Sequence, residues 1–254
     1  MKITFLGTGT SQGIPVIGCG CAVCQSTDIR NNRLRVSVLV ETDDKTIVID
    51  SGPDFRYQML RAGVKDLDAI IYTHEHKDHV AGLDDIRPYN YLLKKVIDIY
   101  ATVRVQDALR REFSYIFEDT KYFGLPQIQL HTVDAQPFLI GKTTIVPFEV
   151  MHHKLPVLGY RFGDFTYITD AKTISDESLE KIKGSKILVI NALQKESHIS
   201  HFTLDEAIAF ANKAGAATTY FTHMSHNLGL HADIEKELPS HIKLAFDGLS
   251  FSIA

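Results

Sequence analysis

Short apolar segments recur along the chain and are bounded by Gly, Pro, Asp and Asn. They are rich in Val, Ile, Thr, Phe and Tyr, which is typical of β-strands. The expected strands cover residues 2–9, 36–42, 46–52, 67–73, 96–102, 144–150, 165–170, 186–192, 218–223 and 243–253. This pattern predicts sheets that supply much of the core.

Between several of these strands, apolar positions repeat with a helical period. The expected helices cover residues 53–63, 80–93, 104–117, 175–184, 203–215 and 231–238. The helix from residue 203 has the clearest start, because Thr203 and Glu206 have the spacing of a capping box. Strands with intervening helices predict an α/β fold whose sheets are covered by outer helices. No Pro/Gly/Ser-rich linker interrupts the pattern, so we expect one domain over residues 1–254.

Composition narrows the classes of function. The 254 residues carry a net charge of -4 with a pI near 6.3, which gives no broad cationic surface for nucleic acid. No apolar run approaches the ~20 residues that cross a bilayer, and the N-terminus lacks the pattern of a secretory signal. We therefore expect a soluble, cytoplasmic protein that binds no membrane and no nucleic acid stably.

Potential metal ligands are most concentrated in residues 73–80, THEHKDHV, which follow an expected buried strand. His74 and His76 alternate and point to one side of an extended chain, whereas Asp78 and His79 are adjacent and need a turn. Four potential ligands on one strand-to-helix loop suit zinc, manganese or iron. The alternative is a solvated polar loop, and the density of ligand-type side chains favours the metal site.

The spacing His74-x-His76-x-Asp78-His79 resembles the signature of the metallo-β-lactamase superfamily. The resemblance implies a four-layer αβ/βα sandwich with two divalent metals, manganese or zinc, between its sheets. It also implies an order of ligands along the chain. His74, His76 and His152 would hold one metal, Asp78, His79 and His223 the other, and Asp170 would bridge them.

Two further residues belong to this site or lie next to it in the sequence. The resemblance implies a role for Asp50, and the role of His153 stays open. The Asp50-Ser51-Gly52 turn matches an Asp-x-Gly of the superfamily, whose Asp supports the metal loop from behind the ligands. His153 is adjacent to His152, and spacing alone does not choose between them as ligand. The resemblance favours His152, which leaves His153 as a substrate contact or a surface residue.

The cysteines Cys19, Cys21 and Cys24 are three in number and closely spaced, which argues against a disulfide framework and leaves metal binding or chance. Together with the THMSH segment they resemble the PhnP-type phosphodiesterases within the superfamily. That resemblance implies a structural zinc held by the three thiolates and His226. Three thiolates and one imidazole suit a closed tetrahedral site.

The same branch implies a proton donor. His201 directly precedes the Phe202-Thr203 helix start, where the resembled enzymes place the histidine that protonates the leaving alkoxide. An imidazole with an ordinary pKa near neutral suits that role. His198 is expected at the rim. Arg33 and Arg35 either contact a phosphate or lie on a solvated strand edge.

These inferences predict a dinuclear metal-dependent phosphodiesterase that acts on small or cyclic phosphodiesters, cyclic ribose phosphates among them, with His201 as general acid and Asp78 at the catalytic metals. The resemblance also implies a homodimer. One rival is the tRNA 3′-processing endonuclease branch, whose members carry a protruding Gly/Pro-rich arm that residues 171–200 do not show. The other is a metal-stabilised binding module without turnover, which would need no proton donor.

Overall fold

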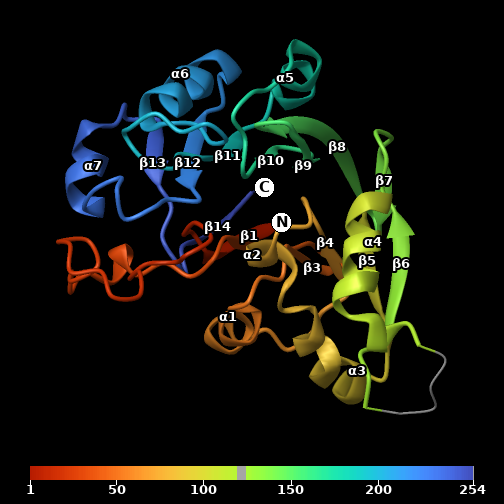
Figure 1. Cartoon of the computed structure of the whole chain (residues 1–254). Helices are drawn as coiled ribbons and strands as arrows, with labels where there is room; N and C mark the ends of the chain where they lie inside the picture. Colours follow the sequence, from red (N-terminus) through yellow and green to blue (C-terminus); the bar gives the residue numbers. More distant parts are fainter. Residues whose placement is uncertain (119–123, 254) are drawn as a thin grey trace.

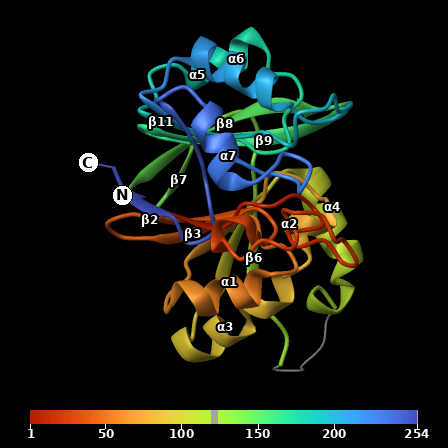
Figure 2. The same ribbon diagram turned by 90° about the vertical axis from the view of Figure 1, so that its left-hand side faces the viewer.

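Two β-sheets face each other in the computed structural model, which describes residues 1–118 and 124–253, and helices cover the outer side of each sheet (Figures 1 and 2). The first sheet has the strand order β14-β1-β2-β3-β4-β5-β6. Its strands are β1 (Lys2–Gly7), β2 (Ser37–Glu41), β3 (Thr46–Ile49), β4 (Ala69–Ile71), β5 (Ile97–Ala101), β6 (Ile128–Thr132) and β14 (Ser250–Ser252).

The second sheet has the order β13-β12-β11-β10-β9-β8-β7. Its strands are β7 (Phe138–Ile140), β8 (Thr143–His152), β9 (Leu155–Phe162), β10 (Phe165–Tyr167), β11 (Ile187–Asn191), β12 (Thr218–Thr222) and β13 (Ile242–Leu244). In the first sheet β14, β1, β2 and β3 pair antiparallel and β3 to β6 pair parallel; in the second, β7 to β10 pair antiparallel and β10 to β13 pair parallel. The carboxyl ends of the parallel strands in both sheets can therefore supply residues to one site.

The helices lie in two groups. On the first sheet are α1 (Phe55–Ala62), α2 (Lys77–Val80), α3 (Arg87–Leu93) and α4 (Val103–Glu112), with the 3₁₀ turns η2 (Leu83–Ile86) and η3 (Ser114–Ile116). On the second are α5 (Asp176–Ile182), α6 (Leu204–Ala214) and α7 (His231–Glu237), and η1 (Ile29–Asn31) lies in the N-terminal loop. Figure 2 shows α1 and α3 on one outer side and α5 and α6 on the other. This is the predicted four-layer αβ/βα sandwich.

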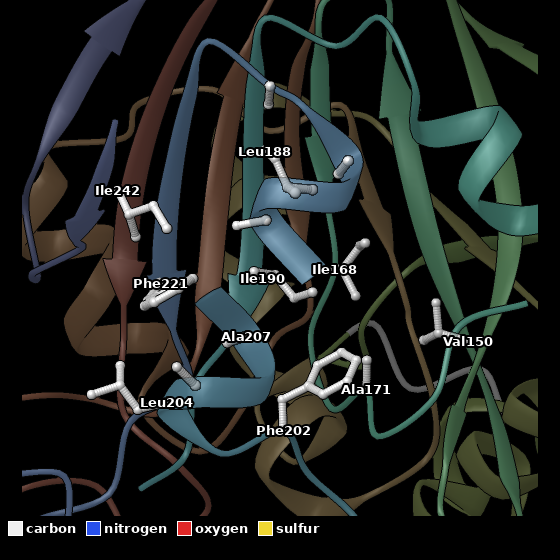
Figure 3. Packing of buried hydrophobic residues seen from close by; sticks show 14 of the residues in the cluster. Val150, Ile168, Ala171, Leu188, Ile190, Phe202, Leu204, Ala207, Phe221 and Ile242 are labelled. Carbon is white, nitrogen blue, oxygen red and sulfur yellow. The ribbon is translucent and has the colours of Figure 1, made fainter. Parts of the chain in front are cut away.

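Strand residues alternate between cores on the two faces of each sheet. In β3, Ile47 and Ile49 face the space between the sheets, while Val48 packs with the helices of the first sheet. In β11, Val189 points between the sheets, while Leu188 and Ile190 pack under α6 with the residues drawn in Figure 3. Because both faces are covered, these strands read as continuous apolar runs.

Several element boundaries differ from the predictions. In place of the helix expected over 80–93, α2 ends at Val80 and is followed by η2 and α3, because the backbone between α2 and η2 bends to meet the Asp50 turn. The strand expected over 243–253 is split into β13 and β14, with Gly248 at φ 90 between them. Strands β6, β7 and β9 were not predicted. β9 contains Pro156 and Gly159, two weak strand formers that its pairing with β8 overrides.

Candidate metal centre

The THEHKDHV segment leaves β4 between the sheets and turns at once into α2. His74 and His79 are buried, Asp78 is partly buried, and His76 is exposed on the open side. The turn depends on close backbone approach: a Cβ on Gly52 would lie 2.0 Å from the carbonyl oxygen of Asp78, and Gly82 donates its N–H to the Ser51 carbonyl. The Asp50 turn and the histidine segment therefore form one packed unit.

Asp50 holds this unit together from beneath. It is fully buried and has φ 62, in the left-handed region that few non-glycine residues adopt. Its carboxylate accepts bonds from the Thr73 backbone N–H at 2.8 Å, the Thr73 hydroxyl at 2.8 Å and His79 Nδ1 at 2.7 Å. Such contacts orient the rings that follow it in the sequence.

These bonds determine which ring nitrogen of each histidine carries a proton. A carboxylate only accepts, so Asp50 keeps a proton on His79 Nδ1, and Nε2 is the nitrogen at which a cation can take the place of a second proton. The Thr73 hydroxyl donates to Asp50 and so accepts from His74 Nδ1 at 3.0 Å, which leaves His74 Nε2 as an acceptor, 2.9 Å from His76 Nδ1. His152 Nδ1 donates to the Ser200 carbonyl at 2.9 Å. Each of the three rings thus offers Nε2 as a possible metal ligand.

Strand ends of the second sheet bring the remaining residues. Asp170 follows β10 with φ 56 and His223 follows β12 with φ 55, so both occupy the same strained region as Asp50. Strain of this kind costs about 1–3 kcal/mol per residue and clusters at functional sites. His223 Nε2 is 3.3 Å from an Asp170 oxygen and 3.7 Å from an Asp78 oxygen, and His79 Nε2 is 3.3 Å from each carboxylate.

The charges are strongly coupled. Burial disfavours a charge on His79, but the carboxylates of Asp78 and Asp170 outweigh it and raise the pKa of His79 well above its usual value. Burial likewise opposes ionisation of Asp170, yet His223 and His79 hold the pKa of Asp170 well below its usual range. The cluster therefore keeps its carboxylates ionised and needs positive charge among them.

The residues fit divalent cations. Two ligand atoms at ~2.1 Å from one tetrahedral cation lie ~3.4 Å apart, close to the 3.3 Å separations that His79 Nε2 makes with the two carboxylates. His79 Nε2 and both His223 nitrogens are buried without a hydrogen-bond partner among the described residues. Three groups have ligand atoms within 4.8 Å: His74, His79 and Asp170; Asp78, His79 and His223; and His152, Asp170 and His201. A site with imidazoles and ionised carboxylates suits zinc or manganese.

His201 lies against this cluster. Its ring centroid is 4.5 Å from that of His152 and 4.8 Å from that of His223, and its Nδ1 is 3.7 Å from an Asp170 oxygen. The next residue, Phe202, donates its N–H to Ala171 and packs in the core of the second sheet (Figure 3). Burial lowers the pKa of His201 to about 3, below the near-neutral value expected from the sequence.

A second cluster forms where the N-terminal loop meets the chain after β12. The sulfurs of Cys19, Cys21 and Cys24 lie 3.3, 3.4 and 3.6 Å from His226 Nδ1, and all four ligand atoms are within 4.8 Å of one another. The N–H of Cys24, together with His226, lowers the pKa of Cys21 to about 6, whereas burial raises that of Cys24 to about 11. This geometry suits a tetrahedral zinc, in which ligand atoms are ~3.6 Å apart.

One short segment joins the two clusters. His223 and His226 are three residues apart, and Met224 between them exchanges backbone hydrogen bonds with Thr8 and Thr10 of the N-terminal loop. The loop that carries the cysteines is thereby attached to the segment that carries His223.

The structure also decides the positions that the sequence left open. His153 is exposed at φ 55 in the β8–β9 turn, while His152 lies in the cluster. Arg33 neither contacts the clusters nor lies on a solvated edge. It is buried and donates to Thr8 Oγ1, the Ala245 carbonyl and His231 Nδ1.

Arg35 is partly exposed and pairs with Asp54 at 3.2 Å.

Sequence reasoning missed two positioning groups, Thr73 and the Ser200 carbonyl. Their only signal was adjacency to a candidate site histidine.

Comparison with known proteins agrees with this geometry. A family model described as "Beta-lactamase superfamily domain" matches residues 45–224. A solved structure titled "Crystal Structure of a New Diphosphatase from the PhnP Family" is 42% identical, with a TM-score of 0.93 over 98% of this chain and 96% of that one. Zn(2+)-bound PqqB from Methylobacterium extorquens has a TM-score of 0.80 over the full length of both chains, but at 17% identity it shows the fold alone.

Curated relatives are longer. A protein named Octanoyltransferase from Porphyromonas gingivalis is 40% identical over 252 residues, which is 98% of this chain and 51% of that protein. Ribonuclease Z from Acaryochloris marina is 30% identical over 168 residues, 65% of this chain and 48% of that protein. This chain thus spans about half the length of these relatives. By its family match, its fold and its near full-length likeness to a PhnP-family structure, the chain belongs to the metallo-β-lactamase superfamily of hydrolases, in its PhnP-like branch.

Proposed function

We propose that this protein is a phosphodiesterase that hydrolyses small or cyclic phosphodiesters, cyclic ribose phosphates among them, at two divalent cations. The observation that supports this most directly is the position of His201. A proton donor has no use in a site that only binds metal, and this ring lies against His152, Asp170 and His223 on an anchored loop.

The proposed ligands are those expected from the sequence: His74, His76, His152, Asp78, His79, His223 and the bridging Asp170. A pair of divalent cations, when bound, supplies an activated water and offsets the negative charge of a phosphodiester. The chain contributes orientation. Asp50, Thr73 and the Ser200 carbonyl fix three rings so that Nε2 of each points away from its anchoring bond.

In this proposal His201 protonates the departing oxygen. Its lowered pKa leaves the ring neutral in the free site at neutral pH. A phosphodiester anion bound beside it favours the charged ring and raises that pKa, so the proton is taken up with the substrate. An alkoxide leaving group is a strong base and needs that proton, whereas p-nitrophenolate is a weak base and needs it much less.

A small substrate is favoured over tRNA by the segment between Asp170 and His201. It consists of α5 and β11, joined by short turns, and it carries no protruding arm in these fully described residues.

None of the described helices combines the length and apolar character required to cross a membrane. The cysteine cluster is proposed to hold a structural zinc that stabilises the segment from His223 to His226.

The test compares leaving groups. The metal-loaded native protein, His201→Ala and the control His131→Ala, which changes a histidine paired with Asp98 on the β5–β6 strands, are assayed on bis-p-nitrophenyl phosphate and on a ribonucleoside 2′,3′-cyclic phosphate. Loss of a general acid costs about 10²- to 10⁴-fold. We expect a loss in this range for the cyclic substrate, a much smaller loss for the p-nitrophenyl ester, and no loss in the control.

Equal losses on both substrates, with metal content retained, would refute the acid role. Absence of hydrolysis of either diester by the metal-loaded native protein would refute the phosphodiesterase proposal.

A further inference from the structure

The loop that carries His201 also carries His198, a second histidine that the proposed reaction does not use. The loop is closed at its base by Leu193 N–H to the Phe202 carbonyl at 3.0 Å and by Leu204 N–H to the Gln194 carbonyl at 2.9 Å. It is also attached to the site, because the Ser200 carbonyl accepts from His152. His198 is therefore held in a defined place relative to the cluster.

His198 lies beside His201, on the side nearer to solvent. The two ring centroids are 5.1 Å apart, and His198 is partly exposed whereas His201 is buried. A substrate whose phosphate lies at the cluster and whose leaving oxygen meets His201 would extend its leaving group toward His198.

The protonation of His198 follows from its neighbour. The Ser200 backbone N–H can only donate, and it does so to His198 Nδ1 at 3.3 Å. In the neutral ring the proton is therefore on Nε2, which becomes a hydrogen-bond donor. Within residues 1–118 and 124–253, Nε2 has no hydrogen-bond partner.

We infer that His198 is a specificity-determining residue that donates Nε2–H to an oxygen of the leaving group, next to the oxygen that His201 protonates. This rests on the proposed function and adds to it a residue that selects among leaving groups. The favoured leaving groups carry a second oxygen beside the scissile one, as polyols and sugars do, and the disfavoured ones are plain alkyl groups.

The inferred hydrogen bond joins the neutral His198 ring to an uncharged oxygen of the leaving group. A net contribution of about 0.5–1.5 kcal/mol for such a hydrogen bond corresponds to roughly a 3- to 10-fold preference. The preference arises on binding, so it does not require proton transfer through His198. The described structure has no hydrogen bond between the rings of His198 and His201.

The test uses two diesters, diethyl phosphate and bis(2-hydroxyethyl) phosphate, which differ only in a terminal hydroxyl on each of the two ester groups, so that either leaving group carries it. Their affinities are measured by calorimetry in the metal-loaded protein carrying His201→Asn, which slows turnover. We expect the hydroxylated diester to bind roughly 3- to 10-fold more tightly. Adding His198→Ala should bring the ratio to about one, and His198→Gln, which keeps an N–H donor, should restore part of it.

Ile199→Ala is the matched control, because Ile199 is an exposed neighbour on the same loop and its change should leave the ratio intact. A ratio near one in the protein with His198 present, or a ratio that persists in His198→Ala, would overturn the inference. Turnover of bis-p-nitrophenyl phosphate by the native protein is measured in parallel. Turnover with no hydroxyl preference refutes the role of His198 alone, whereas absent turnover refutes the proposed function.

Discussion

Replacement of Asp50 by Asn tests the idea that a buried carboxylate sets the metal-binding form of His79. One Asp50 oxygen accepts from the Thr73 backbone N–H, and the other accepts from the Thr73 hydroxyl and His79 Nδ1. The backbone N–H can only donate, so the Asn oxygen must take that position. The Asn NH₂ group then faces His79 Nδ1, which has to become an acceptor, and the proton of His79 moves to Nε2.

The size of the effect follows from this conflict. To bind a cation through Nε2, His79 must return its proton to Nδ1 and leave two buried donors facing each other. A buried unsatisfied donor costs about 1–3 kcal/mol, or roughly 5- to 150-fold in affinity. This agrees with the 10- to 100-fold losses typical of groups that orient metal ligands.

The assay is a competitive titration of zinc and manganese into the metal-free protein, with ¹⁵N NMR of the His79 ring to identify the protonated nitrogen. The matched control is Asp98→Asn, which removes an equivalent carboxylate–histidine contact from the partly exposed pair Asp98–His131. Native-like metal affinity in Asp50→Asn, or a neutral ring, observed above its pKa, that keeps its proton on Nδ1 in the metal-free variant, would show that Asp50 does not control the ligand form.

Two further predictions concern the N-terminal loop. Cys21→Ser should lower the zinc content, measured by mass spectrometry, by one equivalent per chain. The other metals should remain, because the two clusters share only the backbone of one segment. A zinc content equal to the native value would exclude the structural site. Burial lowers the pKa of His231 to about 4 from 6.5, so its unfolded form binds a proton more readily. The stability it contributes is full above pH 6.5 and is lost as the pH falls toward 4. His231→Gln, which still accepts from Arg33, should flatten this part of a urea-unfolding profile, and an unchanged slope would contradict the role of His231.

The candidate ligands of THEHKDHV could be predicted because these residues are close in sequence and their chemistry is local. Short continuous apolar runs predicted most strands for a similar reason, since both faces of each sheet are buried. The pieces of helix around α2 were not predictable. Their boundaries depend on contact between the Asp50 turn and residues 78–82, which are distant in sequence from it.

The identity of the candidate ligands likewise depends on local sequence, whereas the contacts that hold their side chains in place depend on residues distant in sequence. The sequence by itself indicated the types of potential ligand in residues 73–80 and among the three cysteines, because residue type specifies donor chemistry, and the resemblance to the superfamily implied the more distant members of each cluster. Only the tertiary structure placed His152 in the cluster and His153 at the surface, buried Arg33 away from both clusters and placed His198 beside His201. It also assigned the ring protons of His79 and His198, because a proton's position depends on which donor or acceptor folding brings to the other nitrogen.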